Sequence, residues 1–195
     1  GLGGTMNRLI TDYNVETKVI ILGEGITSRS DKRDLSKWSQ QLETHKSNIF
    51  EAASCIGYHE VKTFDYPDNR FDSVDVLDII KTIEIEIKEF SPQVIFTHHL
   101  GDLNIDHQIT FQAVTTATRP MKDEIVKTII CFETPSGTEW IPSTDFRKFN
   151  PNMYVEISLS NLNSKIKAME SYDYEKRKFP HPRSPESLKI LAQYR

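Results

Sequence analysis

The stretch QVIFTHHLGDLNIDH, residues 93–107, joins a short apolar run to a polar segment that leads into a helix. The run over 93–97 is typical of a buried strand, and residues 98–106 are predicted to form a loop. Apolar residues then recur at helical spacing, which predicts a helix over about 109–118. The stretch therefore predicts a strand, a loop and a helix in succession.

The same order of elements occurs twice before this stretch. A β-branched run at 18–22 ends in a glycine loop, and an amphipathic pattern follows from Trp38 to Gly57, where glycine is placed to end a helix. A second run at 59–66 precedes apolar residues at helical spacing over 76–90. This alternation predicts an α/β, Rossmann-like, three-layer fold with a mostly parallel central sheet. Such sheets bind ligands beyond the carboxyl ends of their strands.

The pattern is less regular after residue 120. Strands are predicted over 126–132 and 154–157, and a loop rich in proline, serine and threonine over 134–144. The expected helix caps are Ser160 or Asn161 for one helix and Ser184 for the last. We see no repeat and no linker, and a single domain over 1–195 is expected.

Composition and charge exclude several functions. The chain has 195 residues and a formal net charge of −4 at pH 7, with basic residues scattered among acidic ones, so no nucleic-acid partner is expected. No apolar run approaches the roughly 20 residues that a bilayer requires, so no membrane span is expected. Cys55 and Cys131 lie in apolar patterns, and we interpret both as buried thiols of a cytoplasmic protein.

Reactive side chains are concentrated in residues 97–107. This segment holds three histidines and two aspartates, and neutral imidazole and carboxylate groups both bind zinc. An aspartate helix cap followed by a solvent-facing histidine is the structural alternative. The spacing alone matches no self-sufficient metal motif, so both interpretations stay open.

The segment Asp102-x-Asn104-x-Asp106-His107, after a strand that ends in Thr97-His98, resembles a signature of the PIG-L/LmbE-like zinc-dependent N-deacetylases. Further segments resemble the family in the same order, at residues 1–5, 20–25, 52–57 and 179–186. The resemblance covers almost the whole chain. It implies an LmbE-like fold and hydrolysis of an N-acyl group, usually the acetamide of an N-acetylglucosamine-type sugar, by a zinc-activated water.

The resemblance also implies roles for single residues. His107 corresponds to a zinc ligand, and Asp106 to a carboxylate that supports the site and tunes proton transfer. Asn104 stands where many members have a histidine that acts on the leaving amine or the carbonyl, and asparagine is not an acid at neutral pH. The candidates for an acid in its place are His98, His99 and Asp102.

Two of the family's three zinc ligands and its general base come from a His-Pro-Asp-Asp-Glu segment, which is expected immediately before Gly1. Catalytic zinc normally needs three protein ligands, so the chain as given is expected to bind metal poorly. Family members also continue beyond Arg195, and we expect that the sequence is trimmed at both ends. Zinc is the expected cofactor, with other divalent metals as alternatives.

Four residues elsewhere are candidates for substrate binding, namely Arg183, His181, Glu133 and Trp140. Arg183 is able to grip a hydroxyl or phosphate with its fork of donors, or to pair with a nearby carboxylate. His181 stands between two prolines, where it either faces the site or supports a rigid loop. Glu133 and Trp140 border a loop that suits sugar recognition, and an ordinary surface loop is the alternative.

A pair on the first long helix departs from the family. His45 and Asn48 stand where many relatives have arginine and glutamate. The relatives' use of that pair therefore does not transfer, and we expect both residues on a solvated helix face.

Together these features predict a metal-dependent hydrolase that removes an N-acetyl group from an amino sugar or glycoconjugate. The alternatives are an amidase for a non-sugar N-acyl substrate and a catalytically inactive member that binds glycans or a partner protein. The expected partner is the small-molecule substrate, and homo-oligomerisation stays open.

Overall fold

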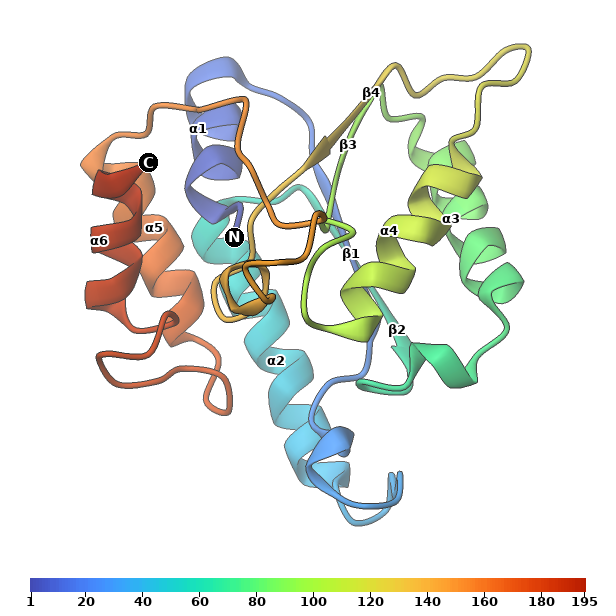
Figure 1. Cartoon of the computed structure of the whole chain (residues 1–195), viewed down its shortest axis with the longest axis horizontal. Coiled ribbons are helices and arrows are strands. Elements are labelled where there is room, and N and C mark those ends of the chain that lie inside the picture. The colour runs from blue at the N-terminus through green and yellow to red at the C-terminus, as the bar shows by residue number, and fades with distance from the viewer. The chain divides into compact units, whose positions relative to one another are not determined.

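Four β-strands alternate with six α-helices in a computed structural model that describes all 195 residues (Figure 1). In chain order they are α1 Gly3–Tyr13, β1 Lys18–Gly23, α2 Ser39–Ile56, β2 Glu60–Tyr66, α3 Val76–Phe90, β3 Val94–Thr97, α4 Ile105–Ala117, β4 Thr128–Cys131, α5 Leu159–Glu170 and α6 Pro185–Tyr194. Short 3-10 turns lie at Thr27–Arg29, Phe71–Ser73 and Thr138–Trp140. The predicted α/β class is confirmed.

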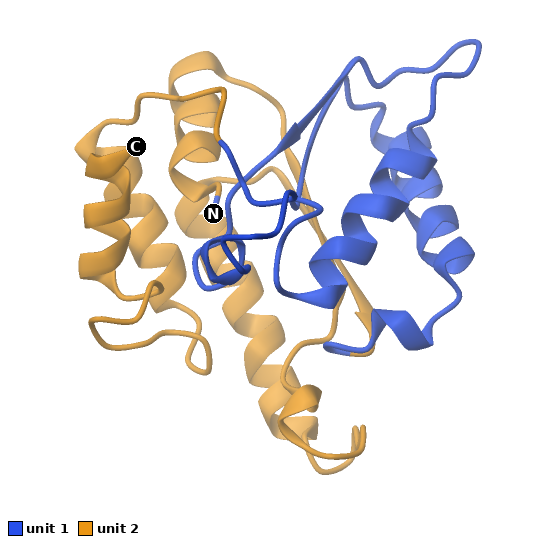
Figure 2. Cartoon of the chain, viewed as in Figure 1, with its two compact units in different colours: residues 1, 68–150 blue, residues 2–67, 151–195 orange.

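The chain divides into two compact units (Figure 2). Unit 1 contains Gly1 and residues 68–150, and unit 2 contains residues 2–67 and 151–195. Each unit has one pair of parallel strands, β3 with β4 in unit 1 and β1 with β2 in unit 2. The strands are parallel, as predicted. They form two pairs, where one central sheet was expected. That residues 1–195 make a single domain stays a prediction from the sequence.

In unit 1, α3 packs against α4 through an apolar face. Ile79, Ile80 and Ile83 recur at helical spacing on α3 and are buried, as are Ala113 and Val114 of α4. Full burial of one isoleucine side chain contributes about 1.5–3 kcal/mol. The β3 register pairs Thr97 with Cys131, so both strands of unit 1 end at one edge.

In unit 2, polar side chains join three helices. The Nδ2 of Asn7 on α1 donates to the carbonyl of Ile56 at the end of α2 (3.0 Å), and its Oδ1 accepts from Asn161 Nδ2 of α5 (2.9 Å). Because Asn7 and Asn161 are both buried, each needs these partners. The predicted end of α2 is confirmed, since Gly57 adopts φ 95°, a left-handed conformation that favours glycine.

One predicted strand and two predicted helix starts are wrong. No strand forms over 154–157, where Ile157 instead packs on the apolar cluster of Leu162, Ile166 and Leu188. Helix α4 begins at Ile105, ahead of the predicted start near residue 109, because Asn104 caps it. Helix α5 is capped by Ser158, two positions before Ser160. The cap of α6 at Ser184 is as predicted.

The solvated face predicted for His45 and Asn48 is also wrong, because both are buried. The segment after α5 covers this part of α2. The His45 ring lies 5.7 Å from the ring of Tyr172, and Asn48 Oδ1 accepts from the backbone N–H of Asp173 (3.2 Å).

Cys55 and Cys131 are free thiols that are only half-buried, short of the full burial expected. None of the six helices is both long and apolar enough to cross a membrane.

Candidate functional site

The reactive segment lies in unit 1, between the end of β3 and the first turn of α4. Asn104 has an extended backbone, and its Oδ1 accepts the N–H of Asp106 (2.8 Å), which caps the helix. The residue that stands in place of the family's histidine therefore begins α4. This cap puts Asp106 and His107 in the first turn.

Asp102 is the most enclosed carboxylate of this segment, with 0% of the residue exposed. Its Oδ1 accepts the N–H of Asn104 (2.9 Å), and its carbonyl accepts from Gln108 Nε2 (2.7 Å). Gly137, from the loop after β4, lies directly against the carboxylate, and a Cβ there would meet Oδ1 at 2.6 Å. Asp102 is thus contacted by Gln108 of α4 and by Gly137 of the 134–144 loop.

His107 and Asp102 form a pair, with His107 Nδ1 2.9 Å from Asp102 Oδ2. Burial would raise the pKa of Asp102, but the adjacent His107 ring, together with the N–H of Asn104, outweighs burial and lowers it. An ionised Asp102 is unsuited to act as the acid. Because a carboxylate oxygen only accepts, we assign a proton of His107 to Nδ1, and Nε2 is the ring nitrogen left for a metal.

His98 stacks on His107, with ring centroids 3.9 Å apart and planes 13° from parallel. Its Nδ1 is buried without a hydrogen-bond partner, and the Phe132 ring lies 5.1 Å away. Burial, and then the proximity of His107, lower the pKa of His98 to about 3. His98 is therefore a neutral imidazole at physiological pH, suited to accept a hydrogen bond or a metal and not to supply an imidazolium proton.

Asp106 faces a different part of unit 1. Its Oδ2 accepts the N–H of Asn69 (2.6 Å) and its Oδ1 the N–H of Phe71 (3.0 Å). Burial raises the pKa of Asp106 above its ordinary value, although these two N–H donors oppose that effect. The resemblance implied that Asp106 supports the site. In the structure Asp106 fixes the loop before α3, while Asp102 contacts the His107 ring.

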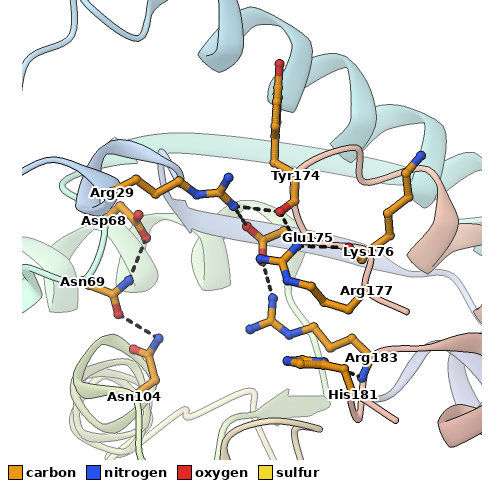
Figure 3. Close-up of polar contacts among 10 residues, drawn as sticks. All are labelled: Arg29, Asp68, Asn69, Asn104, Tyr174, Glu175, Lys176, Arg177, His181 and Arg183. Atoms are coloured by element: carbon orange, nitrogen blue, oxygen red, sulfur yellow. Dashed lines mark hydrogen bonds and ion pairs between the residues drawn. The ribbon is translucent and has the colours of Figure 1, made fainter. Parts of the chain in front are cut away.

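Asn69 links this loop to the cap of α4. Asn104 Nδ2 donates to Asn69 Oδ1 (3.0 Å), and Asn69 Nδ2 donates to Asp68 Oδ1 (3.3 Å), as Figure 3 shows. A sequence signal for this contact was the Pro67-Asp68-Asn69 turn, which follows a strand end. Nothing in the sequence pointed to the contact between Gly137 and Asp102.

His99, the remaining acid candidate, is held by the segment 145–149. Its Nε2 lies 2.7 Å from the carbonyl oxygen of Arg147, and the Phe149 ring stands edge-on 5.2 Å away. Because the carbonyl only accepts, Nε2 carries the proton in this contact. Gly101 is packed under the same carbonyl, with no room for a Cβ.

The substrate candidates fall in both units. In unit 1, Glu133 is half-buried, and Trp140 remains 50% exposed beside a turn where Glu139 accepts the N–H of Ser136 (2.6 Å). In unit 2, Arg183 is paired with Glu175, and His181 Nδ1 accepts the N–H of Arg183 (3.1 Å). Arg183 therefore pairs with a carboxylate, and His181 supports the backbone of its loop. These are the structural alternatives to substrate binding that were considered for the two residues.

The histidines fit a metal only in part. The His107–Asp102 pair has the arrangement of a metal-binding histidine with a supporting carboxylate, and His98 has an unpaired buried nitrogen beside it. Among all 195 residues, however, no group of three or more His, Cys, Asp or Glu side chains is arranged to hold a metal ion. These residues supply part of a ligand set and not a complete catalytic zinc site.

The parallel strands alternate with helices, and the histidine–carboxylate pair lies beyond the carboxyl end of a strand. These two features place the chain in the class of Rossmann-like α/β proteins. Within this class the chain belongs to the PIG-L family, described as GlcNAc-PI de-N-acetylase, whose profile matches residues 1–118. Membership of this family supports a deacetylase-like hydrolase. The search of curated proteins found no match.

Solved structures share the fold at low sequence identity. The conserved protein TT1542 from Thermus thermophilus is 18% identical with a TM-score of 0.71, over 100% of this chain and 80% of that one. The N,N'-diacetylchitobiose deacetylase from Pyrococcus horikoshii, in complex with its inhibitor MPG, is 17% identical with a TM-score of 0.70, over 100% and 72%. The 4-carboxy-2-hydroxymuconate hydratase GalB from Pseudomonas putida is 16% identical with a TM-score of 0.66, over 97% and 77%.

Proposed function

We propose that the protein is a metal-dependent N-deacetylase that releases acetate from an N-acetylated amino sugar or glycoconjugate. The observation that carries this proposal is the His107–Asp102 pair at the first turn of α4. Membership of the PIG-L family and the fold shared with a diacetylchitobiose deacetylase support the same chemistry. A bound zinc, or another divalent ion, supplies a water of lowered pKa and polarises the amide carbonyl.

In this proposal the residues of this chain position and orient the His107 ring that binds the metal. Asp102 holds the His107 ring and keeps its Nε2 available for the metal. Asn104 caps α4 and thereby places His107 at the start of the helix. Asp106 ties that first turn to the loop before α3 through two backbone N–H groups. His98 adds a neutral imidazole against the His107 ring.

Glu133 and Trp140 remain proposed contacts for the sugar. Trp140 is half-exposed, and an exposed indole face stacks well on a sugar ring. The free thiols of Cys55 and Cys131 agree with a reducing compartment, and we include a cytoplasmic location in the proposal.

The test is acetate release by the full-length protein, expressed from its complete gene and loaded with zinc. N-acetylglucosamine and N,N'-diacetylchitobiose are offered as sugars, and an N-acetyl amino acid as the non-sugar amide. We expect acetate from the sugars, and a loss of at least about 100-fold in kcat/KM for His107→Ala. His59→Ala is the matched control, because His59 is an exposed histidine whose Nδ1 contacts only Thr17.

Hydrolysis of the amino-acid amide alone would replace the sugar with a non-sugar substrate. A folded, zinc-loaded protein that releases no acetate from any of these compounds would sink the hydrolase proposal. It would favour the catalytically inactive alternative.

A further inference from the structure

Two arginines of unit 2 pair with the carboxylate of Glu175, and a third bonds to the neighbouring backbone carbonyls (Figure 3). Arg29 Nη2 donates to Glu175 Oε1 (2.7 Å), and Arg183 Nη1 is paired with Glu175 Oε2. Arg29 and Arg177 also share the carbonyl oxygen of Tyr174, at 2.8 Å and 2.7 Å. We call Arg29, Arg177 and Arg183 the arginine cluster.

The arginine cluster has donors to spare. A guanidinium carries five N–H donors, and Arg29 uses only its Nη2 and Arg177 only its Nη1 in hydrogen bonds. The side chains of Arg29 and Arg183 are 35% and 33% exposed, so a ligand is able to reach them. Exposed ion pairs add little stability, so stability alone is a weak reason to gather three cations here.

The backbone beneath the cluster is firmly held. Arg29 ends a 3-10 turn that begins at Thr27, which is fully buried and donates its hydroxyl to Glu24 (2.7 Å). Arg183 precedes Ser184, which is fully buried and caps α6. Such support fixes the backbone from which Arg29 and Arg183 extend, and Glu175 holds their guanidiniums, which lowers the entropic cost of binding.

The surrounding loops are basic in an acidic protein. Segments 27–37 and 172–184 carry eight lysine or arginine residues and four aspartate or glutamate residues, although the whole chain has a net charge of −4. An anion is therefore attracted to this part of unit 2 more than to the average surface.

We propose that the arginine cluster binds a phosphate monoester. Three guanidiniums and one carboxylate leave an excess of two positive charges, and a phosphate monoester carries about −1.5 to −2 at pH 7 with three acceptor oxygens. The planar forks of arginine match such oxygens. This inference rests on the arginine cluster of unit 2 alone and is independent of the proposed function.

Glu175 competes with this phosphate for the same donors. Its two oxygens hold Arg29 and Arg183 in the structure, and an incoming phosphate takes over N–H groups that Glu175 now uses. Removal of the negative charge at Glu175 therefore tightens phosphate binding, whereas removal of an arginine weakens it.

The experiment is calorimetric titration of the full-length protein with N-acetylglucosamine 1-phosphate, N-acetylglucosamine and inorganic phosphate. We expect the sugar phosphate to bind at least about tenfold more tightly than the neutral sugar, and inorganic phosphate to compete with it. Arg29→Gln and Arg183→Gln are each expected to weaken binding of the sugar phosphate about tenfold or more, while Glu175→Gln strengthens it. Arg119→Gln is the matched control, because Arg119 is a half-exposed arginine of unit 1 paired with Glu84.

Weaker binding of an arginine variant could also result from misfolding. The Glu175→Gln variant separates the two causes, since a misfolded protein does not bind more tightly. Equal affinity for the phosphorylated and neutral sugars, or arginine variants that bind like the Arg119→Gln control, would overturn the inference. Acetate release is measured on the same samples. Acetate from neutral sugars without any arginine effect leaves the proposed function standing alone, and arginine-dependent phosphate binding without acetate leaves the phosphate site standing alone.

Discussion

Gly137 and Asp102 show how one residue without a side chain shapes the candidate site. A Cβ on Gly137 would lie 2.6 Å and 2.8 Å from the two carboxylate oxygens of Asp102, which is itself fully buried. No flexible side-chain end is available there to move aside, because Asp102 is held by Asn104 and faces His107. The glycine is therefore required for space.

We predict that Gly137→Ala destabilises the protein by about 1–3 kcal/mol, the usual cost of overpacking. Urea unfolding measures this change. In an Asp102→Ala background the added methyl group meets no carboxylate, so the extra cost of Gly137→Ala should shrink toward zero. Equal costs in the two backgrounds would disprove the contact.

Asp145 forms a compact ionic turn beside the candidate site. Arg147 donates to its carboxylate from Nη2 (2.8 Å), Nε (3.1 Å) and the backbone N–H (2.8 Å). The hydrogen bond from the Arg147 side chain, supported by the backbone N–H, lowers the pKa of Asp145 to about 2. The carbonyl of Arg147 in turn contacts His99 and covers Gly101, so this turn borders the reactive loop.

The pKa of Asp145 predicts a stability change in acid. Because the folded pKa is lower than the unfolded value of about 3.9, the contribution of Asp145 to stability is complete above that value and is lost as the pH falls through about 2. Carbon-13 NMR of the Asp145 carboxyl measures the titration directly. Arg147→Gln should return the midpoint toward about 3.9, whereas Lys148→Gln, an exposed neighbour, should leave it near 2.

At the scale of elements, the cap of α5 couples a helix start to the packing of unit 2. Ser158 Oγ accepts the N–H of Asn161 (3.2 Å), and Asn161 Oδ1 accepts the N–H of Ser158 (2.8 Å). The Nδ2 of the same asparagine donates to Asn7 on α1. One residue thus completes the helix cap and the contact between α1 and α5.

We predict that Ser158→Ala costs about 1 kcal/mol in the free energy of unfolding, the usual value for a lost N-cap. Asn161→Ala should cost about 1–3 kcal/mol because it also leaves the buried Asn7 oxygen unsatisfied. Ser160→Ala is the control: Ser160 is exposed and inside the helix, so its change should stay within about 0.5 kcal/mol. A larger effect at Ser160 than at Ser158 would restore Ser160 as the cap.

The sequence predicted those elements whose signals are local. Apolar spacing on α3, the glycine after α2 and the serine before α6 each act within a few residues, and all three elements are present as expected. The predicted strand over 154–157 failed because tertiary packing decides that segment. Ile157 lies on the α5–α6 cluster and has no neighbouring strand to pair with.

The same limit applies to burial. His45 and Asn48 are polar residues on an amphipathic helix, so a solvated face was the simplest expectation. Tyr172 and Asp173, more than a hundred positions away in the sequence, cover them. No pattern within α2 predicts a cover that comes from another segment.

At the scale of the whole molecule, the sequence predicted the segment that holds the candidate site but not the contacts among its residues. The segment 97–107 does follow a strand end and does enter a helix. The choice of Asp102 as the partner of His107 depends on the backbone turn over 102–104 and on the distant Gly137. These depend on three-dimensional structure that residue types alone do not specify.

Metal binding at His107 is expected to stabilise the native state as a whole, because the unfolded chain has no assembled site. At a free metal concentration of about 100 times Kd the gain is about 2.7 kcal/mol, or roughly 5–10 °C in Tm for a domain of this size. We predict that removal of zinc from the full-length protein with a chelator lowers Tm by this amount. His107→Ala should abolish the difference, and His59→Ala should retain it.

Asp102→Asn provides the finer measurement. A lost carboxylate behind a metal-binding histidine weakens metal binding about 10- to 100-fold, so the zinc-dependent shift in Tm should shrink without disappearing. Differential scanning calorimetry, with a fixed zinc concentration and again with chelator, gives this shift for the unchanged protein and for the three variants. If His107→Ala kept the full zinc-dependent shift, the metal would bind elsewhere, and the His107–Asp102 pair would have to be explained as a structural contact of α4.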